Sequence, residues 1–147
     1  MTAGWNEPLV SVCMVGPRRH FAAGDEIEAE YQIDACDSEE IQAIEAAVLW
    51  TIEGKGDEDL GVHWFERRTP SDAEEGDLRP LHRFRVKLPL SPLSYRGALM
   101  TVRWCVRVRL FLKKGREFVG EQGFTVGSVP AAELIEPPAA DAENAAE

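Results

Sequence analysis

The side chains best suited to chemistry gather in one short stretch, "GKGDEDLGVHW", residues 54–64. Three consecutive acids at 57–59 follow two glycines, and a histidine, His63, comes shortly after them. Oxygen ligands of this kind suit calcium, so a divalent-cation loop is one interpretation. Calcium loops place their acids at alternate positions, however, and here the acids are consecutive. The Gly-Lys-Gly of residues 54–56 also lacks the longer glycine–lysine–serine pattern of a phosphate loop.

Two other interpretations of this segment stay open: a loop that contacts a protein partner, and an ordinary solvated turn. As an interaction loop, its contact residues are the charged and aromatic side chains Lys55, Asp57, Glu58, Asp59, His63 and Trp64. A metal-dependent regulator that uses the same loop is a weaker alternative. No motif in the sequence indicates a cofactor.

Catalysis finds little support elsewhere in the chain. The histidines lie on separate segments, and no local motif joins them to a nucleophile. They are His20, His63 and His82. The cysteines are too few and too irregularly spaced for a disulfide framework or a zinc site. They are Cys13, Cys36 and Cys105. The sequence therefore predicts a protein that is not an enzyme and that has no metal ligands.

The composition indicates one acidic domain. A length of 147 residues suits a single domain, and the formal net charge is −10. An acidic balance argues against nucleic-acid binding, which needs a basic surface. The first ten residues lack the basic and apolar regions of a signal peptide, and no apolar stretch reaches the ~18 residues of a membrane span. We therefore expect a cytoplasmic protein with no membrane span.

The elements that must position these residues are β-strands, because apolar residues recur with period two along most of the chain. Seven strands are expected, over residues 9–15, 25–34, 41–54, 60–67, 81–89, 98–112 and 117–127. Residues 38–50 also fit a capped helix, but the β-rich "VLWTIEG" that follows continues the alternation. Seven strands with loops between them predict an all-β protein, a two-sheet antiparallel immunoglobulin-like sandwich over residues 1–127.

The last two strands have a defined register. The three-residue loop "KKG", with Gly115 where positive φ is needed, joins them. It pairs Leu110 with Phe118, Arg107 with Glu121 and Trp104 with Phe124. Apolar residues then meet on one face and opposite charges on the other.

Charge ladders follow the outer faces of two strand pairs. Arg83, Arg85 and Lys87 are expected beside the acidic ladder of the second strand, at Glu26, Glu28 and Glu30. The arginines of the sixth strand, Arg103, Arg107 and Arg109, are expected between Glu45 and Glu53 on one side and Glu117 and Glu121 on the other. The alternative is a basic stripe for anionic lipid or nucleic acid.

Between two strands, "LPLSPLSYRG" (residues 88–97) is too long and too proline-rich for a tight hairpin, since Pro89 and Pro92 cannot donate to a ladder. We expect it to carry the chain from one sheet to the other. Tyr95 is expected to pack under this crossing and to hydrogen-bond backbone there, as a tyrosine corner does, while Gly97 releases the turn.

These segments resemble a known family. "FRVKLPLSPLSYRGALMTVRWCVRVRL" and "FAAGDEIEAEYQI" are similar to the strands and crossing of the arrestin-type immunoglobulin-like domain, and the chain also resembles its single-domain bacterial relatives. Arrestins carry two such sandwiches, and one is expected here. The resemblance implies an adaptor or scaffold without catalytic residues, which binds a protein partner through loops or a strand edge. The alternative is a structural protein that assembles with itself edge to edge.

The remaining aromatic residues and the C-terminal segment complete the prediction. Trp50 and Trp104 are expected in the core, Cys105 is expected to face away from it, and Trp5 and Trp64 are candidate interface anchors. Residues 128–147 are rich in Ala, Pro and Glu and are expected to form a disordered tail.

Overall fold

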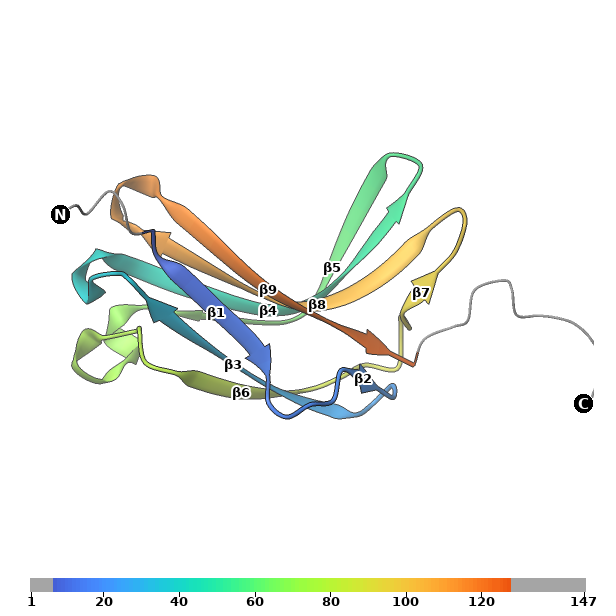
Figure 1. The fold of residues 1–147 in the computed structure, drawn as a ribbon, viewed down its shortest axis with the longest axis horizontal. Coiled ribbons are helices and arrows are strands. Elements are labelled where there is room, and N and C mark those ends of the chain that lie inside the picture. The colour runs from blue at the N-terminus through green and yellow to red at the C-terminus, as the bar shows by residue number, and fades with distance from the viewer. Residues whose placement is uncertain (1–6, 128–147) are drawn as a thin grey trace, which may run out of the picture.

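The computed structural model describes residues 7–127, in which two β-sheets pack face to face and no α-helix occurs (Figure 1). The smaller sheet has the strand order β1-β3-β6. Its strands are β1 (Leu9–Met14), β3 (Glu26–Asp34) and β6 (His82–Lys87), and their pairs are antiparallel. No helix in this part of the chain is long and apolar enough to cross a membrane.

The larger sheet has the order β2-β9-β8-β4-β5, and β7 pairs with β8 beside this path. Its strands are β2 (His20–Phe21), β4 (Ile41–Gly54), β5 (Asp57–Arg68), β7 (Tyr95–Arg96), β8 (Thr101–Leu112) and β9 (Glu117–Val126). The short β2–β9 pair is parallel, and the other pairs of the sheet are antiparallel. The predicted all-β, immunoglobulin-like sandwich is therefore confirmed, with all seven expected strands and two additional two-residue strands, β2 and β7. The expected tail, residues 128–147, lies outside the described residues, as does Trp5.

The core lies between the sheets, where alternate residues of facing strands meet. In β3, Ile27, Ala29, Tyr31 and Ile33 are at most 2% exposed, as their alternation predicts. Trp104 of β8 is 1% exposed and is one of the largest buried side chains. Trp50 was also expected in the core, but it is only half-buried and packs against Trp104 from the edge. Toward its end, β4 runs into the hairpin that rises away from the two packed sheets (Figure 1).

The charge ladder of β3 and β6 pairs as its sequence order predicts. Along β3 and β6, Glu26 faces Lys87, Glu28 faces Arg85 and Glu30 faces Arg83. The Arg83 guanidinium lies 2.9 Å from the Glu30 carboxylate, and that of Arg85 lies 3.6 Å from Glu28. The arginine ladder of β8 pairs as predicted only in part: Arg107 and Arg109 have acidic partners, but Arg103 lies opposite Thr51. The hairpin of β8 and β9 also has the expected register, with Leu110 opposite Phe118, Arg107 opposite Glu121 and Trp104 opposite Phe124.

The proline-rich segment 88–97 does cross between the sheets, because it leaves β6 in one sheet and enters β7 in the other. Two groups hold it in place. Ser94 exchanges hydrogen bonds with the backbone of Val126: its N–H donates at 2.8 Å and its Oγ accepts at 2.9 Å. Trp104 Nε1 donates to the Pro92 carbonyl at 2.9 Å.

The prediction that Tyr95 forms a tyrosine corner is wrong. Tyr95 is half-buried, and its hydroxyl has no hydrogen-bond partner among residues 7–127. Its ring covers Gly97 instead, so that a Cβ added to Gly97 would lie 2.4 Å from the ring. The polar anchors of the crossing are therefore Ser94 and Trp104. Gly97 is required because an aromatic ring occupies the space of its missing side chain.

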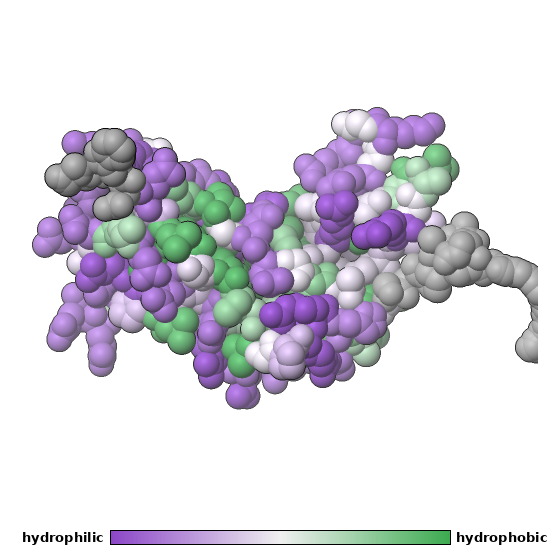
Figure 2. Space-filling model, viewed as in Figure 1, coloured by the Kyte–Doolittle hydropathy of each residue, from purple (hydrophilic) through white to green (hydrophobic). Residues whose placement is uncertain are grey.

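The larger sheet bends, so that the β4–β5 hairpin and the β7–β8 end rise together from the sandwich (Figure 1). The space-filling view shows a hollow between these raised ends and the opposite end of the molecule (Figure 2). The outer face of the larger sheet is therefore concave. This bend explains why Ala47 and Leu49, on the outer face of β4, are 9% and 2% exposed.

The pair of Arg107 and Glu121 allows a test of the β8–β9 register. We expect Glu121→Arg to lower the free energy of unfolding by up to about 1 kcal/mol, because two arginines then face each other on an exposed surface. Reversing both charges, as Arg107→Glu with Glu121→Arg, should recover part of that loss. Urea melts of the four proteins measure the coupling. A double variant as unstable as the sum of the singles would contradict the observed ion pair.

The crossing yields a second prediction. We expect Trp104→Phe to cost about 2–4 kcal/mol, because it leaves the half-buried Pro92 carbonyl unpaired and opens a cavity around the buried Trp104 position. Tyr95→Phe should cost less than about 0.5 kcal/mol, since the hydroxyl that it removes has no partner in the described residues. Denaturant melts compare the two variants. Equal losses of stability would show that Tyr95 anchors the crossing after all.

Candidate functional site

The segment singled out by its chemistry is the end of the β4–β5 hairpin. Lys55 and Gly56 form its two-residue turn, with φ of 44° and 86°. Positive φ at both central residues is the geometry of a tight turn whose twist matches the flanking strands. The expected loop over residues 54–64 is therefore corrected, because strand β5 already begins at Asp57.

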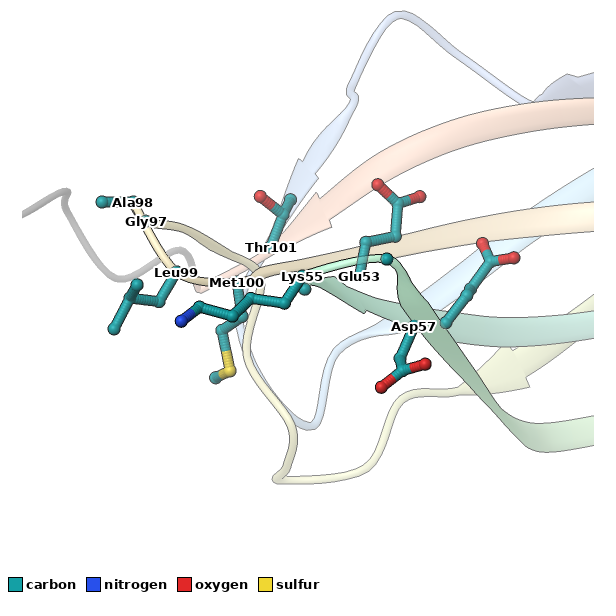
Figure 3. Close-up of a pocket in the computed structure, with 11 residues that line it drawn as sticks. Glu53, Lys55, Asp57, Gly97, Ala98, Leu99, Met100 and Thr101 are labelled. Carbon is teal, nitrogen blue, oxygen red and sulfur yellow. The ribbon is translucent and has the colours of Figure 1, made fainter.

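The hairpin turn forms one wall of a cleft of about 480 Å³ (Figure 3). The other wall is the connection between β7 and β8, which contributes the exposed side chains of Leu99 and Met100. The walls touch at Gly54, where an added Cβ would lie 2.8 Å from the Leu99 carbonyl oxygen. The two segments that form the cleft therefore pack directly against each other at Gly54.

The acids do not converge on this cleft. Consecutive residues of a strand point to opposite faces, so the carboxylates of 57–59 diverge. Figure 3 shows the carboxylates of Glu53 and Asp57 on opposite sides of the hairpin. Lys55 extends toward Leu99 and Met100. Within residues 7–127, no group of three His, Cys, Asp or Glu side chains is arranged to hold a metal ion.

His63 occupies a β-bulge. Val48 of β4 pairs with Trp64 and the next residue, Leu49, pairs with Val62, so that His63 is an extra residue in β5. Its Nε2–H donates to the Lys87 carbonyl of β6 at 2.6 Å. The ring also meets the core residue Trp104 edge-on. His63 therefore connects the edges of the two sheets.

The residues of β5 after the bulge continue this connection. Trp64 stacks on Phe84 of β6, with ring centroids 4.6 Å apart. Glu66 lies 3.2 Å from His82 of β6. Arg68 donates to the hydroxyl of the buried Tyr31 at 3.0 Å. We call these contacts of β5 with the smaller sheet the β5 seam.

The seam borders a second cleft, of about 740 Å³, between the end of β5, the start of β6 and the loop 69–81. Two of the charged side chains that line it already have partners in the seam, Glu66 with His82 and Arg68 with Tyr31. Burial raises the pKa of Tyr31, while the hydrogen bond from Arg68 acts in the opposite direction. The tyrosine is therefore a protonated acceptor for the guanidinium at neutral pH.

The outer face of β5 carries the residues that the sequence analysis missed. Leu60, Val62 and Phe65 are 51%, 50% and 53% exposed. They pair with Thr51, Leu49 and Ala47 of β4, which are themselves buried. We call these three exposed side chains the β5 strip. A signal existed in the sequence, since Leu60 and Val62 alternate with small or polar residues, but the bulge conceals that Phe65 joins them.

Cys105 lies on the same outer face, opposite Leu49. Its predicted orientation away from the core is correct, yet the thiol is partly covered. Burial raises the pKa of Cys105 to about 11, and the nearby Glu121 adds to the increase. At neutral pH the group is a protonated thiol, which is a poor nucleophile.

The two packed sheets, the crossing and the bent larger sheet define an arrestin-like β-sandwich. Among solved structures, the chain is similar to Spo0M, a sporulation control protein from Bacillus subtilis, which has this fold. The TM-score is 0.57 and the sequence identity is 16%, over 81% of this chain and 49% of the Spo0M chain. The chain thus spans about half the length of that structure. No protein-family model matches the chain, and neither does any curated protein.

Two strand glycines test how the hairpin is packed. A Cβ at Gly61 would lie 2.2 Å from the Trp50 ring, whereas one at Gly123 would meet only the Trp104 carbonyl oxygen at 3.8 Å. We expect Gly61→Ala to cost about 1–3 kcal/mol through overpacking. Gly123→Ala should be neutral or slightly stabilising, because alanine has less conformational freedom than glycine when unfolded. Urea melts decide, and equal melts would show that Trp50 does not lie over Gly61.

Proposed function

We propose that this protein is a non-catalytic interaction module, an adaptor or scaffold, that binds a protein partner along the free edge of β5. One observation carries the proposal: the three large apolar side chains of the β5 strip stand about half exposed on an edge strand. Exposed apolar patches of this kind mark interaction sites. An edge strand also presents unpaired N–H and C=O groups to a partner.

The mode of binding follows from this combination. Within residues 7–127, β5 pairs with β4 alone, so its other edge is open to an added strand. In strand addition, main-chain hydrogen bonds supply affinity and alternate side chains supply specificity. The β5 strip would contact the alternate apolar residues of an extended partner segment. The charged residues at both ends of β5 would limit where that segment binds.

Two further observations support the proposal. The fold is similar to that of Spo0M, a sporulation control protein, and a regulatory role for this chain is in line with that likeness. The cysteines Cys13, Cys36 and Cys105 are free. Free thiols favour a reducing compartment, so the proposal includes a cytoplasmic location.

Matched variants test the proposed function. Val62 of the β5 strip and Val119 of β9 are 50% and 52% exposed, and both lie on the outer face of the larger sheet. We expect a tagged Val62→Asp protein to lose the partners that wild type captures from native cell extract, and Val119→Asp to keep them. Thermal melts of both variants check that they are folded.

The captured partner must also bind at the free edge of β5. Added to ¹⁵N-labelled protein, it should shift the amide resonances of residues 60–65 more than those of β1 or β9. Identical captures by the two variants, or shifts confined to other strands, would contradict an interaction edge at β5.

A further inference from the structure

The charges along β5 run in a fixed order. The strand begins with the acids Asp57, Glu58 and Asp59, continues through the β5 strip, and ends with Arg67 and Arg68. When a strand pairs antiparallel with a copy of itself, the start of one lies beside the end of the other. Such pairing of β5 therefore places an acidic end beside a basic end at both extremes of the contact.

The bulge determines which side chains share a face in that pairing. Because His63 is an extra residue, the outer face of β5 carries Glu58, Leu60, Val62, Phe65 and Arg67. A two-fold axis at Val62 then places apolar side chains opposite apolar ones and acidic side chains opposite basic ones. Val62 meets Val62 of the second copy, Leu60 meets Phe65, and Glu58 meets Arg67. On the inner face, Asp57 lies opposite Arg68, whose guanidinium also donates to Tyr31 within its own chain.

Neighbouring registers lack this agreement. An axis at Gly61 sets Phe65 against Glu58, and an axis at Trp64 sets Leu60 against Arg67. The Val62 register contains one pair of like charge, Asp59 with Glu66. Glu66 already contacts His82 Nε2 at 3.2 Å within its own chain.

We propose that the partner of the β5 edge is a second copy of this chain, bound antiparallel about a two-fold axis at Val62. This inference rests on the proposed function, since it names the partner of the same edge. The two larger sheets become one continuous sheet across the dimer. The contact is isologous, so each copy supplies both halves of every pair. Pairing brings the β5 strips of both copies into cross-strand contact and satisfies the open strand edges.

Charge reversal at Glu58 and Arg67 tests this register. In a dimer of Glu58→Arg, two arginine pairs face each other, and in a dimer of Arg67→Glu, two glutamate pairs do. We expect each variant alone to dimerise at least about tenfold more weakly than wild type, since two opposite-charge pairs become like-charge pairs. An equimolar mixture of the two should dimerise about as well as wild type, because every 58–67 pair is then of opposite sign. Sedimentation velocity across a wide concentration range measures this.

Arg67 also contacts Glu45 of its own chain at 2.7 Å, so that Arg67→Glu changes an intrachain ion pair as well. A second pair of variants leaves that ion pair intact. Val62→Asp should be monomeric at every concentration at which wild type is dimeric, while Val119→Asp should dimerise normally. A monomeric wild type, or a charge-reversed mixture no better than its components, would overturn the self-pairing. If partner capture is still lost in Val62→Asp, the interaction edge stands and only the identity of its partner is wrong. A dimer insensitive to Val62→Asp overturns the self-pairing by placing the dimer contact elsewhere, and the capture experiment decides the proposed function by itself.

Discussion

The single extra residue in β5, His63, determines how this sandwich is closed and what it exposes. A bulge interrupts a ladder and bends its strand. Here the imidazole recovers a hydrogen bond by donating to the Lys87 carbonyl at the edge of the smaller sheet. From that point on, the side chains of β5 reverse faces. Trp64 turns inward to stack on Phe84, and Phe65 turns outward to join Leu60 and Val62. The β5 seam and the β5 strip are two consequences of one insertion.

Because the β5 seam joins the two sheets, β5 makes contacts with both of them. Its backbone pairs with β4, whereas its inward side chains contact β6 and Tyr31 of β3. An aromatic stack contributes about 0.5–1.5 kcal/mol beyond its buried area, and a hydrogen bond to a charged group about 1.5–3 kcal/mol. Side chains committed to the seam are not free for a ligand. The outward side chains and the open backbone edge remain for binding, and this division of roles places the candidate site on the strip.

Much of this architecture was predictable, because its determinants are local or pairwise. Alternation identified all seven long strands, and matched charges identified the β3–β6 neighbours, as Glu28 and Arg85 illustrate. The bulge was not predictable. Strict alternation from Leu60 sets Trp64 on the face of Val62, and nothing in "LGVHWFER" indicates that one residue is extra. The turn was missed for a similar reason, since Lys55 adopts a positive φ that sequences usually signal with Asn or Asp. The sequence also does not show which side chain hydrogen-bonds the backbone of the crossing. In the structure Trp104 Nε1 donates to the Pro92 carbonyl, and the Tyr95 hydroxyl does not take this part.

The edge of β5 also carries features that protect an open, apolar strand against unspecific pairing. Natural edge strands are protected by charges, bulges or short length. β5 is long, with 12 residues, and its bulge twists the edge at the centre. Its charges are confined to the two ends: three acids at the start, and Glu66, Arg67 and Arg68 at the end, so that the two ends have net charges of opposite sign. A strand added in an arbitrary register meets an unmatched charge at one end or the other, which disfavours disordered stacking. The same arrangement leaves the centre free for a strand whose charges are ordered in reverse. Protection and recognition therefore rest on one pattern, and a change that removes the end charges is expected to weaken both.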